Sequence, residues 1–136
     1  MDKQIAKMWV DALESGQYEQ GKEYLCAKDQ YCCLGVLCEL YIKQTGNDIR
    51  GPGVYDDCVK YDNEACVLPQ CVIDWAGIGI GKDVALPFYG NANAAFLVNE
   101  QEIFLTSWND GEERYFGKDG TFSNIAAAIK KHWEKI

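Results

Sequence analysis

The chain begins with an amphipathic pattern that predicts a helix over residues 2–15. Ile5, Trp9, Ala12 and Leu13 follow one another at the spacing i, i+4, i+7, i+8, which places them on one face of an α-helix. A glycine follows at the position where such a helix ends. This first segment is therefore expected to pack its apolar face against a core.

The pattern from Tyr31 to Gly46 is the strongest helical signal in the chain. Gly35 lies inside it, although a glycine in a helix interior costs about 1 kcal/mol relative to alanine. We therefore expect another part of the backbone to pack against this turn. The apolar face of the predicted helix consists of Leu34, Leu37, Cys38 and Tyr41.

The middle of the chain carries shorter patterns around glycine- and aspartate-rich turns. Residues 54–55 and 58–61 predict two short strands. Pro69 stands where a third helix begins, and the pattern that follows it ends at Gly77. A glycine-rich loop over residues 77–81 is expected next.

The last third of the chain alternates strand and turn signals before a final helix. Residues 96–98 and 103–106 predict two strands, joined by a tight connection at residues 99–101. Residues 109–111 and 118–120 are turn signals. Thr121 or Ser123 can cap the final helix, whose apolar stripe is Ile125, Ala126, Ile129 and Trp133.

Together these elements predict a single α+β domain over residues 1–136. About four helices are expected to pack on a small, mostly antiparallel sheet drawn from the second half of the chain. No repeat, low-complexity run or linker divides the sequence. Its 136 residues, of which 48% are apolar or aromatic, can bury one core without metal or disulfide support.

The acidic balance limits the partners that the chain can bind. Thirteen basic and twenty-one acidic residues give a net charge of −8, which disfavours duplex nucleic acid. A compact phosphate ligand is still allowed, because one local pocket can oppose the global charge, and Arg50 and Arg114 are the only arginines available to it. The sequence shows neither a signal peptide nor about eighteen consecutive apolar residues, so we expect a cytosolic protein without a membrane partner.

The seven cysteines are better explained as buried thiols than as a metal site or a disulfide framework. Cys32, Cys33 and Cys38 lie inside the strongest helical pattern, which fits small buried side chains in a reducing cytosol. Zinc sites have closer ligand spacing than the later cysteines offer. We expect no metal and no cofactor, although a fourth ligand could complete a site at Cys58, Cys66 and Cys71.

Catalytic groups are scarce, so we expect a protein that is not an enzyme. The single histidine, His132, stands near the end of the final helix, where a solvated side chain is stabilised by the helix dipole. The loop over residues 77–82 lacks the glycine spacing and the Ser or Thr of a phosphate-binding loop. The alternative is a metal-dependent enzyme that uses carboxylates such as Asp110 and Glu112.

Aromatic and amide side chains outside the helical patterns are the remaining candidates for binding. Such rings can stack on a nucleobase while amides contact its edge. The equally weighted alternative is that each ring folds back onto the core, as we expect for Trp9, Trp75 and Trp133. The candidates are Tyr18, Gln20, Phe88, Tyr89, Asn91, Asn93, Trp108 and Asn109.

Four stretches carry a family resemblance across nearly the whole chain: ALESGQYEQGK (residues 12–22), CCLGVLCELY (32–41), LPxxVxxWAG (68–77), and WNDG (108–111) followed by TFxxIA. The double-cysteine run is the most specific of them. Together they resemble a widespread family of small phage and prophage proteins of unknown function. A longer insert between Asp110 and Thr121 departs from the family pattern.

The resemblance implies a phage immune-evasion protein in the host bacterial cytoplasm that sequesters a cyclic nucleotide without cleaving it. The signal would be a cyclic dinucleotide of CBASS immunity, such as 3′3′-cGAMP, or a cyclic ADP-ribose relative of Thoeris immunity. A third possible function, besides sequestration and metal-dependent degradation of a nucleotide, is inhibition of a basic host protein by this acidic chain, and net charge alone suggests it.

Specific residues can be assigned to this sequestration hypothesis. Tyr18 or Trp108 would stack on a base, and Gln20 or Asn109 would contact its edge. The phosphate would meet Lys22, Arg50 or Arg114. The high count of aromatic residues also predicts a homo-oligomer, a dimer or a tetramer, with ligand contacts from more than one chain.

Overall fold

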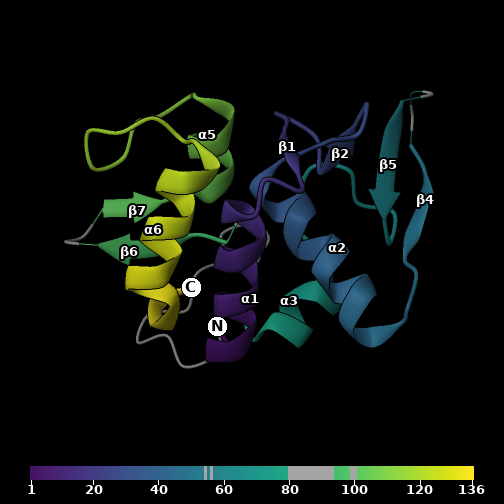
Figure 1. Cartoon of the computed structure of the whole chain (residues 1–136), viewed down its shortest axis with the longest axis horizontal. Helices are drawn as coiled ribbons and strands as arrows, with labels where there is room; N and C mark the ends of the chain where they lie inside the picture. Colours follow the sequence, from purple (N-terminus) through teal and green to yellow (C-terminus); the bar gives the residue numbers. More distant parts are fainter. Residues whose placement is uncertain (54, 56, 80–93, 99–100) are drawn as a thin grey trace.

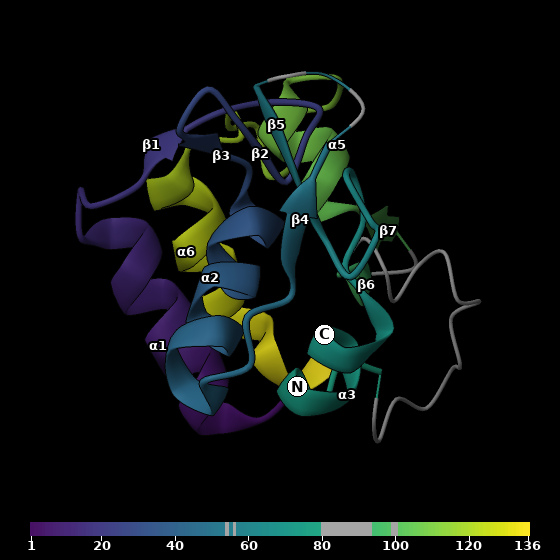
Figure 2. The same ribbon diagram turned by 90° about the vertical axis from the view of Figure 1, so that its right-hand side faces the viewer.

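Helices provide most of the framework in the computed structural model, which describes residues 1–53, 55, 57–79, 94–98 and 101–136. Figure 1 shows α1 and α6 side by side, with α2 next to α1, and the view in Figure 2 agrees. The described helices are α1 (Lys3–Glu14), α2 (Cys33–Thr45), α3 (Gln70–Ala76), α5 (Leu105–Asp110) and α6 (Phe122–His132), followed by a 3-10 turn at Trp133–Lys135.

Two sheets accompany the helices within the described residues. The larger has the strand order β1-β3-β2-β5-β4; its β1–β3 pair is parallel and its other pairs are antiparallel. The smaller is the antiparallel β6–β7 pair. The bounds are β1 (Glu19–Gln20), β2 (Cys26–Ala27), β3 (Gln30–Tyr31), β4 (Arg50–Pro52), β5 (Cys58–Tyr61), β6 (Phe96–Val98) and β7 (Gln101–Ile103).

The predicted α+β class is confirmed, but the expected origin of the sheet is wrong. The five-stranded sheet comes from residues 19–61 in the first half of the chain. Its strands are two to four residues long, which is too short to give a recognisable alternation of apolar and polar residues in the sequence. Of the strand expected at residues 54–55, residue 54 lies outside the described ranges and Tyr55 is not in a strand. β5 pairs instead with β4, from Arg50 to Pro52, on one side and with β2 on the other.

The core lies between α1, α2 and α6 and extends under α3 and α5. Trp9 is fully buried, while Trp75 and Trp133 pack against the core with part of their surface exposed. The two chain ends meet beside α1 (Figures 1 and 2), where the ammonium of Met1 donates a 2.8 Å hydrogen bond to the carbonyl of Ile136. Asp2 caps α1 by accepting from the backbone amides of the first turn.

The close backbone approach predicted at Gly35 is confirmed. A Cβ atom at Gly35 would lie 1.7 Å from the carbonyl oxygen of Leu25, which is buried. The same carbonyl accepts a hydrogen bond from the Cys32 amide at the start of α2. The helix also ends as expected at Gly46, which has a left-handed φ of 73°. Gly35 therefore allows α2 to lie directly against the chain that enters β2.

The last third of the chain differs most from its predicted elements. Of the strand predicted at residues 103–106, only Ile103 lies in a strand, because β7 spans Gln101–Ile103 and α5 begins at Leu105. The turn signal at residues 109–111 is instead the end of α5, where Gly111 takes a left-handed φ of 79°. Leu105 and Trp108 share one buried face, so core packing outweighs the local strand preference.

Other predicted features are confirmed or lie outside the described residues. Helix α3 follows Pro69 and ends at Gly77, and Thr121 caps α6 by accepting from the Asn124 amide. None of the helices in the described part of the chain has the length and apolar character that crossing a membrane requires. Residues 80–93 and 99–100 are outside the described ranges, and with them the candidates Phe88, Tyr89, Asn91 and Asn93.

Candidate functional site

The side chain of Asn109 forms a buried hydrogen-bonded centre between elements that are far apart in sequence. It is 2% exposed and makes four hydrogen bonds. Its Oδ1 accepts from the Cys33 amide at 3.2 Å, and its Nδ2 donates to the Gly21 carbonyl at 2.8 Å. The Cys33 amide is in the first turn of α2, where backbone donors lack helical partners. Asn109 thereby caps α2 from α5.

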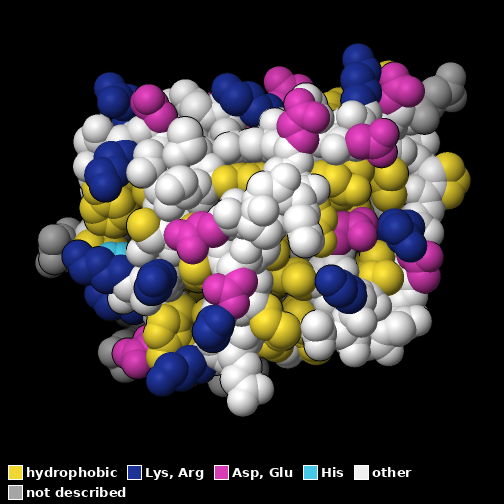
Figure 3. Space-filling view, viewed as in Figure 1, with side chains coloured by type: hydrophobic (Ala, Val, Ile, Leu, Met, Phe, Trp, Pro, Cys, Tyr) yellow, Lys and Arg dark blue, Asp and Glu magenta, His cyan; other side chains and the backbone are white. Residues whose placement is uncertain are grey.

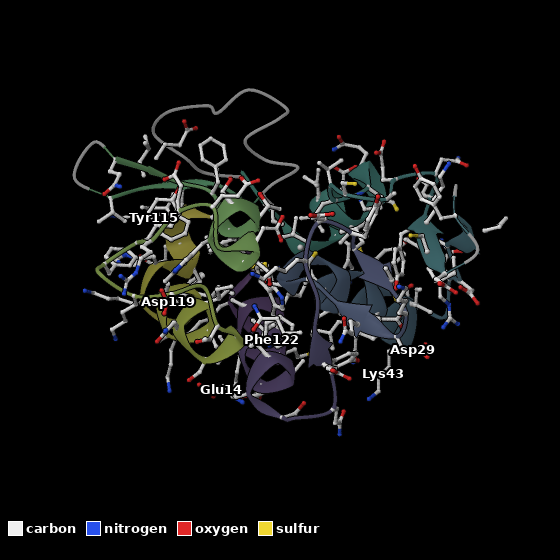
Figure 4. All side chains as sticks on the ribbon, turned by 90° about the horizontal axis from the view of Figure 1, so that it is seen from above. Glu14, Asp29, Lys43, Tyr115, Asp119 and Phe122 are labelled. Atoms are coloured by element: carbon white, nitrogen blue, oxygen red, sulfur yellow. The ribbon has the colours of Figure 1, made fainter. Side chains whose placement is uncertain are left out.

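Gln20 extends this centre to the start of α6. Its Nε2 donates to Asn109 Oδ1 at 3.0 Å and to the Gly120 carbonyl at 2.7 Å, while its Oε1 accepts from the Phe122 amide at 3.0 Å. The amides of Gln20 and Asn109 therefore hold β1, α2, α5 and α6 together. Figure 4 shows Phe122 nearer the middle of the molecule than Tyr115 and Asp119.

These residues form one wall of a hollow of about 420 Å³, called the Lys22 hollow below. The ammonium of Lys22 lies 3.3 Å from the position that a Cβ atom on Gly111 would take, so the missing side chain leaves space for it. Lys22 forms no ion pair with any residue that the structure describes. The lining residues are Gln20, Lys22, Trp108, Asn109, Gly111, Asp119, Gly120 and Thr121.

Four of the seven residues assigned to ligand binding from the sequence thus line the Lys22 hollow. Trp108 is 1% exposed, and its indole nitrogen donates to the Lys118 carbonyl at 2.9 Å. A Cβ atom at Gly120 would lie 1.7 Å from the Trp108 carbonyl oxygen, so the loop before α6 lies directly on α5. Trp108 is therefore a packed helical residue rather than the loop residue expected from the sequence.

The other three assigned residues lie elsewhere. Tyr18 packs edge-on against Tyr31, with ring centroids 5.3 Å apart. Arg50 pairs with Asp48 at 2.9 Å, and hydrogen bonds from the guanidinium lower the pKa of Asp48 to about 2. Arg114, on the loop between α5 and α6, pairs with Asp119 at 2.9 Å. None of the three lines the Lys22 hollow.

A second hollow of about 200 Å³, here the Phe116 hollow, adjoins the first through Trp108. The sequence assigned no binding role to the other residues around it. Phe116 is the most exposed aromatic side chain in this region, at 49%. The lining residues are Trp108, Phe116, Lys118, Asn124, Ala127, Ala128, Lys131 and His132.

His132 lies between two phenylalanine rings rather than in solvent as expected. Its ring stacks on Phe116, with centroids 6.0 Å apart and an interplanar angle of 12°, and tilts against Phe96 at 5.6 Å. Partial burial lowers the pKa of His132, and the positive charges of Lys131 and Lys135 lower it further. In Figure 3 the histidine, drawn cyan, has several dark-blue basic side chains beside it.

The backbone holds Phe116 in this position at a conformational cost. Phe116 and Gly117 have φ values of 56° and 69°, and the Lys118 amide donates to the Tyr115 carbonyl at 3.0 Å. Two successive central residues with positive φ are the requirement of a type I′ turn, which favours Asn, Asp and Gly. A left-handed phenylalanine costs about 1 kcal/mol. The sequence indicates this site only by a phenylalanine, Phe116, at a turn position where Asn, Asp or Gly is usual.

The cysteine and carboxylate side chains do not form a metal-binding cluster in the described part of the chain. Burial raises the pKa of the Cys32 thiol to about 12, and Cys33 and Cys38 are buried as expected. Cys66 is exposed, and no three His, Cys, Asp or Glu side chains among the described residues come together as metal ligands. The carboxylate of Asp110 accepts from the Glu23 amide and from Asn109.

The fold and its hollows define a small α+β domain with two adjoining concavities around α5 and the start of α6. The chain belongs to the family described as Domain of unknown function (DUF8296), whose model matches residues 1–133. Comparison with curated proteins gives no match, and comparison with solved structures gives none either.

Proposed function

We propose that this protein binds a cyclic nucleotide signal in the Lys22 hollow and sequesters it without cleavage. In this proposal it is a phage-encoded immune-evasion protein that acts in the cytoplasm of the bacterial host. The supporting observation is that the exposed Lys22 borders a hollow of about 420 Å³ whose wall is fixed by the hydrogen-bonded amides of Gln20 and Asn109. The stretches of sequence that resemble phage proteins support the biological setting.

Lys22 is the group that would meet a phosphate. It is exposed and has no carboxylate partner among the described residues, while the net charge of the chain is −8. An unpaired cation beside a hollow is an attractive local site for an anion on such a surface. Thr121, at the start of α6, lines the same hollow, and its hydroxyl oxygen accepts from the Asn124 amide.

Gln20 and Asn109 have a different role in this proposal from reading a base edge. Their amides are committed to hydrogen bonds with α2, α5 and α6, so they fix the wall of the hollow. A wall held by buried hydrogen bonds is preorganised, which reduces the entropy lost on binding. Tyr18 and Arg50 lie outside the hollow and are not part of this proposed site.

Calorimetric titration with cyclic di- and trinucleotides and cyclic ADP-ribose relatives tests the proposal. We expect one of them to bind with Kd below about 10 μM, or around −7 kcal/mol. Lys22→Gln should weaken that binding at least about tenfold, because a charge-assisted contact is lost. Lys3→Gln, at an exposed lysine on α1, should leave it unchanged. No binding from the whole panel would sink the proposal.

The same complex distinguishes sequestration from degradation. After incubation with magnesium and manganese, the complex is heat-denatured and the released ligand is analysed by mass spectrometry. Sequestration requires the ligand to be recovered intact. A cleaved product would instead support the metal-dependent enzyme, with Asp110 and Glu112 as its first candidate groups.

We further propose that the protein works as a homo-oligomer with ligand contacts from more than one chain. The chain has four tryptophans and eight tyrosines, residue types that are enriched at interfaces, and ligand sites favour interfaces. Light scattering at tens of micromolar should give a multiple of the 15.3 kDa chain mass, a dimer or a tetramer. A mass of 15.3 kDa would contradict this prediction.

A further inference from the structure

We propose that the Phe116 hollow is a second binding site, selective for a nucleoside phosphate whose base stacks on Phe116 and whose phosphate meets Lys118 and Lys131. The site is distinct from the Lys22 hollow, although Trp108 borders both. The inference therefore stands or falls independently of cyclic nucleotide binding at Lys22.

The first argument is the placement of the Phe116 ring. The ring stacks on His132 and packs at an interplanar angle of 63° against Trp108, with ring centroids 5.9 Å apart, yet 49% of the residue remains exposed. A ring held by two others but open to solvent is a platform on which a planar base can stack. The positive φ at Phe116 places a bulky aromatic residue in a strained backbone conformation, and such strain clusters at functional sites.

The second argument is the charge of the hollow. Lys118, Lys131 and His132 line it, whereas none of the described residues that line it is Asp or Glu. On a chain with a net charge of −8, a concavity with two lysines and no carboxylate is a local exception. Among the described residues neither lysine forms an ion pair. An anionic ligand is the chemistry that this arrangement favours.

Nearby carboxylates do not cancel this charge. Asp119 pairs with Arg114 at 2.9 Å and lines the other hollow. Glu113 interacts with the hydroxyl of Tyr115, whose pKa is raised mainly by burial. Two acidic side chains of the loop that carries Phe116, those of Glu113 and Asp119, thus have partners other than the lysines of the hollow.

The third argument is the volume of the Phe116 hollow and the polar side chain of Asn124 that lines it. A hollow of about 200 Å³ is smaller than most ligand pockets, which span about 300–1,000 Å³. It can hold one part of a nucleotide, while the rest of the molecule lies over the exposed face of Phe116. The amide nitrogen of Asn124 donates to the Asp119 carbonyl, so its oxygen is the atom left to accept from a base or a ribose.

Adenosine 5′-monophosphate is a suitable probe, with binding followed by amide chemical shifts of the full chain. We expect saturable shifts around Phe116, Lys118, Lys131 and His132. Adenosine and inorganic phosphate, tested separately, should each bind at least about tenfold more weakly than the nucleotide, because each satisfies only one half of the site.

The sharpest variant is Phe116→Asn. Asparagine suits a type I′ turn, so the thermal stability should stay the same or rise, while nucleotide binding should weaken at least about tenfold. Tyr55→Asn is the matched control, because Tyr55 is 65% exposed and does not line the hollow. A stable Phe116→Asn protein that binds the nucleotide as tightly as the parent would overturn the proposal.

The charge is tested by a pair of neighbouring lysines on α6. Lys131→Gln should weaken binding about fivefold, whereas Lys130→Gln should not, because only Lys131 lines the hollow. Lys22→Gln should also leave these shifts unchanged, which separates this site from the one proposed for cyclic nucleotides. If Lys130→Gln and Lys131→Gln weakened nucleotide binding equally, the binding would be general electrostatic attraction to the surface, which contradicts the proposal. Chemical-shift changes confined to the residues of the Lys22 hollow would contradict it as well.

Discussion

Asn109→Leu is expected to lower the free energy of unfolding by about 3–4 kcal/mol. The substitution keeps a side chain of similar shape but removes four hydrogen bonds. It leaves the Cys33 amide and the Gly21 carbonyl buried without their partner, and each unsatisfied buried group costs about 1–3 kcal/mol. Urea denaturation followed by circular dichroism measures the loss.

Asn47→Leu is the control for this prediction. Asn47 is exposed and its side-chain amide donates one hydrogen bond, to the Tyr41 hydroxyl. We expect its replacement to change the free energy of unfolding by less than about 1 kcal/mol. If both variants lost the same small amount, the network around Asn109 would not be the connection between α2 and α5 that the hydrogen bonds indicate.

Gly35→Ala is expected to destabilise the protein by about 3 kcal/mol or more, the opposite of its effect in an isolated helix. Helix propensity alone would favour alanine by about 1 kcal/mol. Here the new Cβ would lie 1.7 Å from the carbonyl oxygen of Leu25 and 2.6 Å from its carbon, so the backbone entering β2 has to move. The same urea experiment measures the loss.

Gly51→Ala provides the matched glycine control. Gly51 lies in β4, its φ is not in the left-handed region, and no atom lies within 4 Å of the position of an added Cβ. We expect its stability to stay within about 0.5 kcal/mol of the parent. A Gly35→Ala protein as stable as the Gly51→Ala protein would refute the close approach of Leu25 to α2.

Part of the candidate site could be predicted from the sequence. Lys22 and Trp108 were selected by residue type, and the structure places both on one hollow. The polar partners of Asn109 were out of reach, because its contacts at Cys33 and Gly21 are 76 and 88 positions away. Phe116 was also missed, since its importance depends on a left-handed backbone and on the ring of His132.

The sequence by itself determined the elements that rest on local physics. The helices α1 and α6 have apolar faces of helical period, and α2 is apolar on all sides over residues 33–38. The caps Asp2, Gly46 and Thr121 mark one end of α1, α2 and α6 respectively. Even the packing at Gly35 was predictable, because a glycine inside a helix weakens it and is favoured there only where another backbone comes too close for a side chain.

Only the tertiary structure decided the short strands, α5 and the two hollows. Strands of two to four residues are stabilised by pairing with distant segments, so their local pattern is too weak to define them. Residues 103–106 have strand-forming side chains, yet burial of Leu105 and Trp108 directs the chain into α5. The hollows exist because that helix meets the loop before α6, a contact that no local pattern encodes.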